Sequence, residues 1–264
     1  MNPLEPGPIS APPPVAGAPT DPPQSARDPG SPRRIVVAAL VAGVTAGLAA
    51  WLGGEGIHGA FSPTETYALL ASGKMDQLNN AARSREATLA FGMLGGALGL
   101  AMGLAGGLAR RSARAATIAA AVGLPLGIAV GVVPALVLLP IADANREQLS
   151  DGLALPLLIH IGLWSAIGAA GGWVLGFGAG GRAVRAGLGG LLGAGVAILI
   201  YEFVGALAFP LAQTGRPLAA TWGTRLLARL AVATLAAGGA AWATAGASPG
   251  PPVTGAHEAP RFGP

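Results

Sequence analysis

The sequence predicts an all-α fold, a polytopic transmembrane helical bundle of about six spans, and two observations carry that prediction. Six long apolar stretches are separated by short connectors that hold nearly all of the charge. A helix needs roughly 20 apolar residues to cross the hydrocarbon core, and each stretch has about that length. Glycine makes up 43 of the 264 residues and only 11% are charged, a balance typical of packed membrane helices. The predicted spans are 35–53, 87–108, 115–140, 153–180, 188–210 and 226–245.

The chain is predicted to begin with a tail. Residues 1–32 hold eleven prolines and no apolar period, so we expect a disordered cytoplasmic spacer, with proline-rich ligand motifs as the alternative. The first apolar run starts only at Ile35, too far along for a secretory signal, and is predicted to be retained as a span. It opens a transmembrane domain over residues 33–246, and residues 247–264 are predicted to be a second disordered, proline-rich tail.

The largest predicted connector, residues 54–86, follows the first span. Ser62, Pro63 and Glu65 have the pattern of a helix start, and apolar residues recur after them at near-helical spacing as far as Ala82. This pattern fits an amphipathic helix lying on the outer leaflet or over the bundle. It fits equally well a plain extension of the second span into solvent.

Glycines spaced by four residues are the strongest internal motif. Residues four apart lie on one face of a helix, so each row makes a smooth groove against which another helix can pack closely. We expect tight packing within one bundle, with homo-oligomer contacts as the second choice. Spans two and three resemble spans four and five in having a glycine row and an Arg-x-x-Arg turn, which fits a duplicated hairpin or chance. The rows are Gly95, Gly99, Gly103 and Gly107, and Gly168, Gly172, Gly176 and Gly180.

The arginines predict the orientation in the membrane. Three segments on the side of the termini carry only positive charge, whereas the opposite connectors mix acidic and basic residues. Because basic residues concentrate on the cytoplasmic side, both termini are predicted to be cytoplasmic. Arg216, Arg225 and Arg229, around the start of the last span, fall on the other side and weaken this assignment. The purely positive segments contain Arg33 and Arg34; Arg110, Arg111 and Arg114; and Arg182 and Arg185.

Composition and motifs also bear on source and function class. Fifteen arginines against one lysine, with abundant Ala, Gly and Pro, indicate a high-GC bacterium and hence its cytoplasmic membrane. The net charge of +4 comes from arginines at helix ends, so no nucleic-acid partner is expected. The absence of cysteine excludes disulfides and thiolate metal sites. Ser165 and His160 share one predicted helix about 140° apart and cannot act as a catalytic pair, so we expect no enzyme activity and no cofactor.

Three polar side chains at membrane depth form the candidate intramembrane site. His160 lies in the fourth predicted span, Glu202 in the fifth and Arg229 in the sixth, all in the half away from the termini. An unpaired charge there costs at least about 2.5 kcal/mol, so Glu202 is predicted to pair with Arg229, with His160 as a nearby hydrogen-bond partner. Such a cluster would lock the bundle structurally. Alternatively, it would be a proton- or ion-linked site in which Glu202 titrates and His160 relays.

Two segments resemble uncharacterised multi-pass inner-membrane proteins of high-GC bacteria. They are Gly-Gly-Glu-Gly-Ile-His-Gly-Ala (53–60) and Gly-Ala-Leu-Ala-Phe-Pro-Leu-Ala (205–212), and the resemblance extends over most of the chain. It implies a multi-pass membrane protein and carries no known activity. We therefore expect a structural or scaffolding membrane bundle that contacts the lipid bilayer. The alternative is a small proton- or ion-linked transporter or channel that uses Glu202, His160 and Arg229.

Overall fold

The described part of the chain folds into six α-helices. A computed structural model describes residues 32–62, 74–144, 154–208 and 218–246, and these ranges contain no strand. Each helix is long and apolar enough to cross a membrane, so the prediction of an all-α bundle with six spans is confirmed. The helices are α1 (Pro32–Ile57), α3 (Met75–Ala109), α4 (Ala113–Ala144), α6 (Ala154–Gly178), α7 (Ala183–Ala208) and α8 (Trp222–Ala245). Apart from Pro32, where α1 begins, both predicted tails fall outside the described residues.

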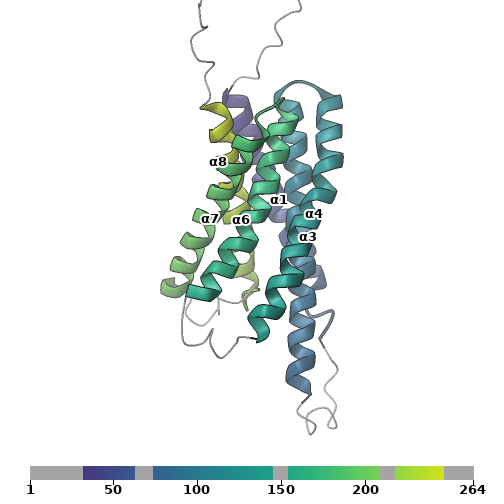
Figure 1. The fold of residues 1–264 in the computed structure, drawn as a ribbon, viewed down its shortest axis with the longest axis vertical. Coiled ribbons are helices and arrows are strands. Elements are labelled where there is room, and N and C mark those ends of the chain that lie inside the picture. The colour runs from purple at the N-terminus through teal and green to yellow at the C-terminus, as the bar shows by residue number, and fades with distance from the viewer. Residues whose placement is uncertain (1–31, 63–73, 145–153, 209–217, 247–264) are drawn as a thin grey trace, which may run out of the picture.

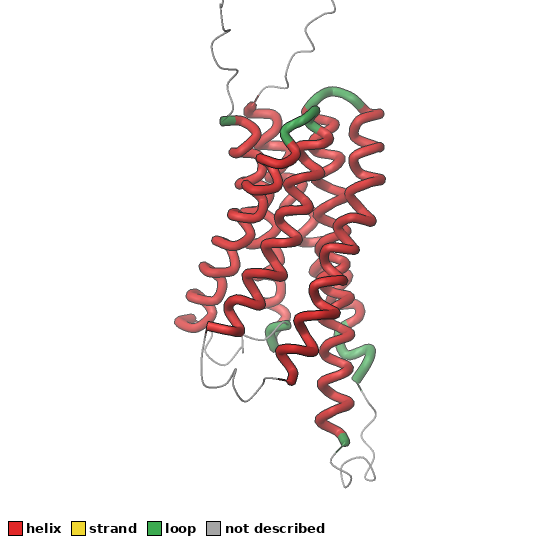
Figure 2. Tube along the Cα trace, in the orientation of Figure 1, coloured by secondary structure: helices red, strands yellow, loops and turns green. Residues whose placement is uncertain are grey.

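Successive helices run antiparallel along the long axis (Figure 1). Helix α1 therefore begins, and α8 ends, at one end of the bundle, which we name the terminal end. The α3–α4 and α6–α7 turns also lie at the terminal end, and we name the opposite end the far end (Figure 2). The arginines of the three purely positive segments all belong to the terminal end.

The helices alternate between an interior and a peripheral position. In an apolar stretch of 18 residues within each helix, 67% of the residues are buried in α3, 61% in α6 and 44% in α8. The corresponding fraction is 33% or less in α1, α4 and α7. Helix α4 packs on α3 and α6, α7 packs on α6 and α8, and α1 packs on α8 and α3. The inner helices supply large core side chains: Phe91 of α3 meets Trp164 of α6 edge-on, with ring centroids 5.2 Å apart. Each outer helix keeps one face for lipid.

Helix α3 is longer than a span requires. Its 35 residues measure about 52 Å, whereas the hydrocarbon core is about 30 Å thick. The surplus extends past the other helices at the far end (Figure 1). Residues 75–86 are thus an unbroken continuation of the second span, which is the extension considered above and not a separate helix lying on the membrane. The predicted helix start at residues 63–65 lies outside the described residues.

Both glycine rows face a neighbouring helix of the same chain. A Cβ at Gly99 of α3 would collide with the backbone of Gly123 in α4, and a Cβ at Gly168 of α6 would collide with the backbone of Gly190 in α7. Only glycine lets two backbones approach this closely. In lipid, where the hydrophobic effect does not drive helices together, this close packing stabilises their association. Because the rows are covered within the chain, they offer no surface for a second copy. The residues that pack in this way are Gly95, Gly99, Gly103, Gly107, Gly168, Gly172 and Gly176.

Gly180 does not belong to its row, which corrects the prediction for this residue. Helix α6 ends at Gly178, and Gly180 has a φ of 100°, a left-handed conformation that favours glycine. It closes a Schellman cap, in which the Gly181 N–H donates to the Gly176 carbonyl and the Gly180 N–H donates to that of Phe177.

Helix α3 ends in the same cap, with Arg111 in the left-handed position. Its φ is 57°, its N–H donates to the Leu108 carbonyl, and the Ser112 N–H donates to that of Gly107. When the two caps are placed in register, the last three glycines of the α3 row coincide with the first three of the α6 row. This shared frame supports the interpretation of α3–α4 and α6–α7 as a repeated hairpin, about 70 residues apart.

Substitutions at the two capping positions are expected to shift stability in opposite directions. Arg111→Gly removes a side chain from a left-handed backbone and should raise the free energy of unfolding by about 1 kcal/mol. Gly180→Ala adds a Cβ at a φ of 100°, 3.0 Å from the Arg110 guanidinium, and should lower it by roughly 1–2 kcal/mol. Unfolding by SDS titration in mixed micelles measures both, and effects of the same sign would contradict the assignment of the caps.

Candidate functional site

The structure brings two of the three predicted site residues together. Nδ1 of His160 in α6 and Oε1 of Glu202 in α7 lie 2.6 Å apart, within hydrogen-bond distance. Each residue lies six positions, about 9 Å, from the far end of its helix, so antiparallel packing places the two at the same depth. The His160 side chain is 4% exposed and that of Glu202 is 18% exposed. The pair therefore links two spans and leaves part of the carboxylate accessible.

Three more polar groups lie within five residues of this pair along the same two helices. Trp164 Nε1, Ser165 Oγ and Tyr201 Oη are buried and have no hydrogen-bond partner among the described residues. The Tyr201 hydroxyl lies near the Thr224 side chain of α8. A buried polar group without a partner costs roughly 1–3 kcal/mol. This part of the bundle is therefore more polar, and less completely satisfied, than the glycine interfaces.

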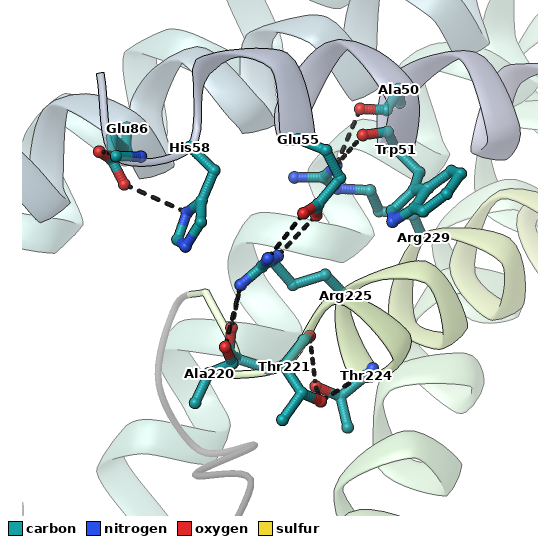
Figure 3. A network of polar contacts seen from close by, with 12 residues as sticks. Ala50, Trp51, Glu55, His58, Glu86, Ala220, Thr221, Thr224, Arg225 and Arg229 are labelled. Atoms are coloured by element: carbon teal, nitrogen blue, oxygen red, sulfur yellow. Dashed lines mark hydrogen bonds and ion pairs between the residues drawn. The ribbon is translucent and has the colours of Figure 1, made fainter. Parts of the chain in front are cut away.

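Arg229 does not join the pair, so the predicted ion pair between Arg229 and Glu202 is wrong. Its guanidinium turns toward α1, where Nη1 donates to the backbone carbonyls of Ala50 at 2.8 Å and Trp51 at 3.1 Å (Figure 3). The residue is 3% exposed. Gly54 makes the room, because a Cβ there would overlap the guanidinium. Arg229 thus joins α8 to α1 through carbonyl groups that a sequence does not reveal.

The ion pair of the first and last spans is formed instead by Arg225 and Glu55. Arg225 Nε and Nη2 donate to the two carboxylate oxygens of Glu55, each at 2.7 Å, in a bidentate arrangement (Figure 3). Nη1 donates to the carbonyls of Ala219 at 3.0 Å and Ala220 at 3.2 Å. Arg225 is buried and Glu55 is one-quarter exposed. The planar guanidinium therefore ties α1, α8 and the segment before α8 together.

A third buried charge lies on α3. Oε1 of Glu86 accepts a hydrogen bond of 2.8 Å from the backbone N–H of Gly59, just beyond α1, and Oε2 lies 3.4 Å from His58 Nδ1 (Figure 3). Glu86 is 6% exposed. Segment 53–60 therefore contacts both helices that pack on α1, which are α3 and α8. Its members Glu55, His58 and Gly59 make polar contacts, and Gly54 admits Arg229.

Glu55 and Arg225 are the residues that sequence reasoning missed. Glu55 was expected in the connector after the first span and Arg225 before the last one, yet α1 continues to Ile57 and α8 begins at Trp222. One signal was available, since Thr221 is a good helix-capping residue. Its hydroxyl accepts the Thr224 N–H at 3.4 Å and starts α8 four residues before the predicted span.

The described residues contain no group of three or more His, Cys, Asp or Glu side chains that could hold a metal ion. Comparison with family models, with curated proteins and with solved structures finds no match to this chain. The resemblance to uncharacterised inner-membrane proteins therefore stays a prediction.

Proposed function

We propose that this integral membrane protein has a structural role, as a rigid six-helix bundle whose buried charges serve as inter-helix locks. One observation carries the proposal: every buried charged side chain among the described residues bridges two segments of the chain. Arg229 and Arg225 join α8 to α1, and Glu86 joins α3 to the end of α1. Charges that are satisfied inside the chain are not available to a passing solute. Scaffolding of other membrane proteins is the role such a bundle would fill.

We further infer that the bundle lies in a bacterial cytoplasmic membrane with both termini in the cytoplasm. The arginines at the terminal end support this orientation, since the described residues there include no acidic side chain. Arg225 and Arg229 no longer count against it. Both are held inside the bundle by internal partners and do not act as free positive charges of a connector.

The second candidate function is proton-linked transport through His160 and Glu202. It is favoured by the partial exposure of Glu202 and by the three unpartnered polar groups on the same helices. A carboxyl group and an imidazole joined by a hydrogen bond can pass a proton between them. Because Arg229 binds carbonyl groups of α1, the transport candidate lacks the positive charge that was expected beside Glu202.

One substitution separates the two candidates. For the structural role, Glu202→Gln weakens the hydrogen bond to His160 and should lower the free energy of unfolding by about 1 kcal/mol, as inter-helix hydrogen bonds in membranes do. Proteoliposomes of the unmodified protein should show no proton uptake above empty vesicles when valinomycin and a potassium gradient set a negative interior. Asp76→Asn, which changes an exposed carboxylate in the extension of α3, is the matched control and should alter neither quantity.

Proton uptake by the unmodified protein that Glu202→Gln abolishes, with unchanged stability, would establish the transport candidate and overturn the structural one.

A further inference from the structure

An apolar groove runs along the outside of α7 and α8 at the terminal end. It encloses about 490 Å³, within the range of roughly 300–1,000 Å³ found for small-molecule sites. Its floor is formed where the two helices touch, because a Cβ at Gly189 would meet the Gly239 carbonyl and one at Gly193 would meet that of Leu235. Leu192, 65% exposed, and Trp242, 78% exposed, stand on either side as walls. No helix among the described residues covers these side chains.

The groove has a charged end and an apolar end. Arg185, the third residue of α7, lines it at the terminal end and makes no hydrogen bond or ion pair with any described residue. The neighbouring Arg182 is already engaged, since its Nη1 donates to the Thr244 carbonyl at 2.6 Å. From Arg185 the groove continues along α7 to Val196, about 16 Å deeper. That depth is close to the thickness of one leaflet, half of the roughly 30 Å core.

We propose that this groove binds one anionic phospholipid of the leaflet at the terminal end, with its phosphate on Arg185 and one acyl chain along the glycine floor. The charge fits, because the terminal end carries unpaired arginine and the described residues there hold no carboxylate to compete with a phosphate. The length of the groove fits, because its apolar part ends at the depth at which an acyl chain of one leaflet ends. A groove that faces the bilayer is filled by lipid, and a basic group at its mouth selects among lipids by headgroup charge.

Binding is measured by native mass spectrometry of the full chain in a mild detergent, titrated with dioleoyl phosphatidylglycerol or with dioleoyl phosphatidylcholine. The unmodified protein should retain one phosphatidylglycerol molecule in preference to phosphatidylcholine. Arg185→Gln should weaken phosphatidylglycerol binding roughly fivefold and leave phosphatidylcholine binding unchanged. Arg114→Gln is the matched control, because it removes an equally exposed arginine from the same end of the bundle, on α4 and away from the groove.

Leu192→Trp tests the acyl-chain part of the groove without touching the charge. The larger ring narrows the groove and should weaken the binding of both lipids, with the helical circular dichroism of the bundle unchanged. Equal losses for Arg185→Gln and Arg114→Gln would overturn the proposal, since they would indicate diffuse attraction by the whole basic end. A lipid-free dimer that Leu192→Trp dissociates would overturn it as well, because a second copy of the chain would then occupy the groove.

Discussion

Methionine in place of Arg225 is expected to lower the free energy of unfolding by roughly 2–4 kcal/mol. The substitution keeps a long apolar side chain but leaves the Glu55 carboxylate without the two hydrogen bonds of 2.7 Å that hold it. It also frees two backbone carbonyls that Arg225 satisfies before α8. Breaking a fully buried pair costs about 3–5 kcal/mol, and the partial exposure of Glu55 reduces the figure because water can reach the abandoned carboxylate.

The control for this effect is Arg85→Met, which removes an exposed arginine from the same end of the bundle and should change stability by less than about 0.5 kcal/mol. A double-mutant cycle with Glu55→Gln isolates the interaction. If the two residues form the lock described above, the double variant should be more stable than the sum of the single losses predicts. Strict additivity in SDS-induced unfolding would mean that the pair contributes no coupling.

Valine in place of Gly99 is expected to have the second large effect, a loss of about 3 kcal/mol or more. Its Cβ would overlap the carbonyl of Gly123, and neither backbone can move without separating α3 from α4 along their whole interface. The milder Gly99→Ala keeps the test usable if the valine variant does not fold, and should still cost about 1–2 kcal/mol. Both are measured as the change in free energy of unfolding in mixed micelles.

Gly162 supplies the matched control, because it lies in α6 with nothing within 4 Å of its hypothetical Cβ. Gly162→Ala should be neutral or stabilise the bundle by up to about 0.5–1 kcal/mol, since alanine loses less backbone entropy in a helix. Equal effects of alanine at Gly99 and Gly162 would show that helix propensity, and not backbone approach, decides the role of the rows.

The six spans could be predicted because bilayer thickness sets the length of an apolar helix, and length is visible in a sequence. The depth of a side chain follows from the same count, which is why His160 and Glu202 were expected near each other. The direction in which a side chain points around the helix axis does not follow from its depth. Helix α8 lies between α1 and α7, and only packing decides that Arg229 turns toward α1. Its acceptors are backbone carbonyls, which every residue carries and no motif marks.

The glycine rows likewise show which features of the packing a sequence does not reveal. Their spacing identifies a face that can approach another helix, but the identity of that helix comes from the topology. Within each hairpin the nearest partner is the next helix in the chain, so the rows are used before a second copy can reach them. Gly180 followed the spacing by coincidence, since the helix had already ended.

The alternation of outer and inner helices has an electrical consequence. All three inner helices, α3, α6 and α8, run in the same direction, from the far end to the terminal end. Their peptide dipoles therefore add and are opposed by those of the three outer helices, and each inner helix leaves roughly half a negative charge on its own last carbonyls at the terminal end. At the end of α8, Arg182 meets this partial charge directly, because its Nη1 donates to the Thr244 carbonyl. A basic residue next to the start of an outer helix thus also satisfies the end of an inner one.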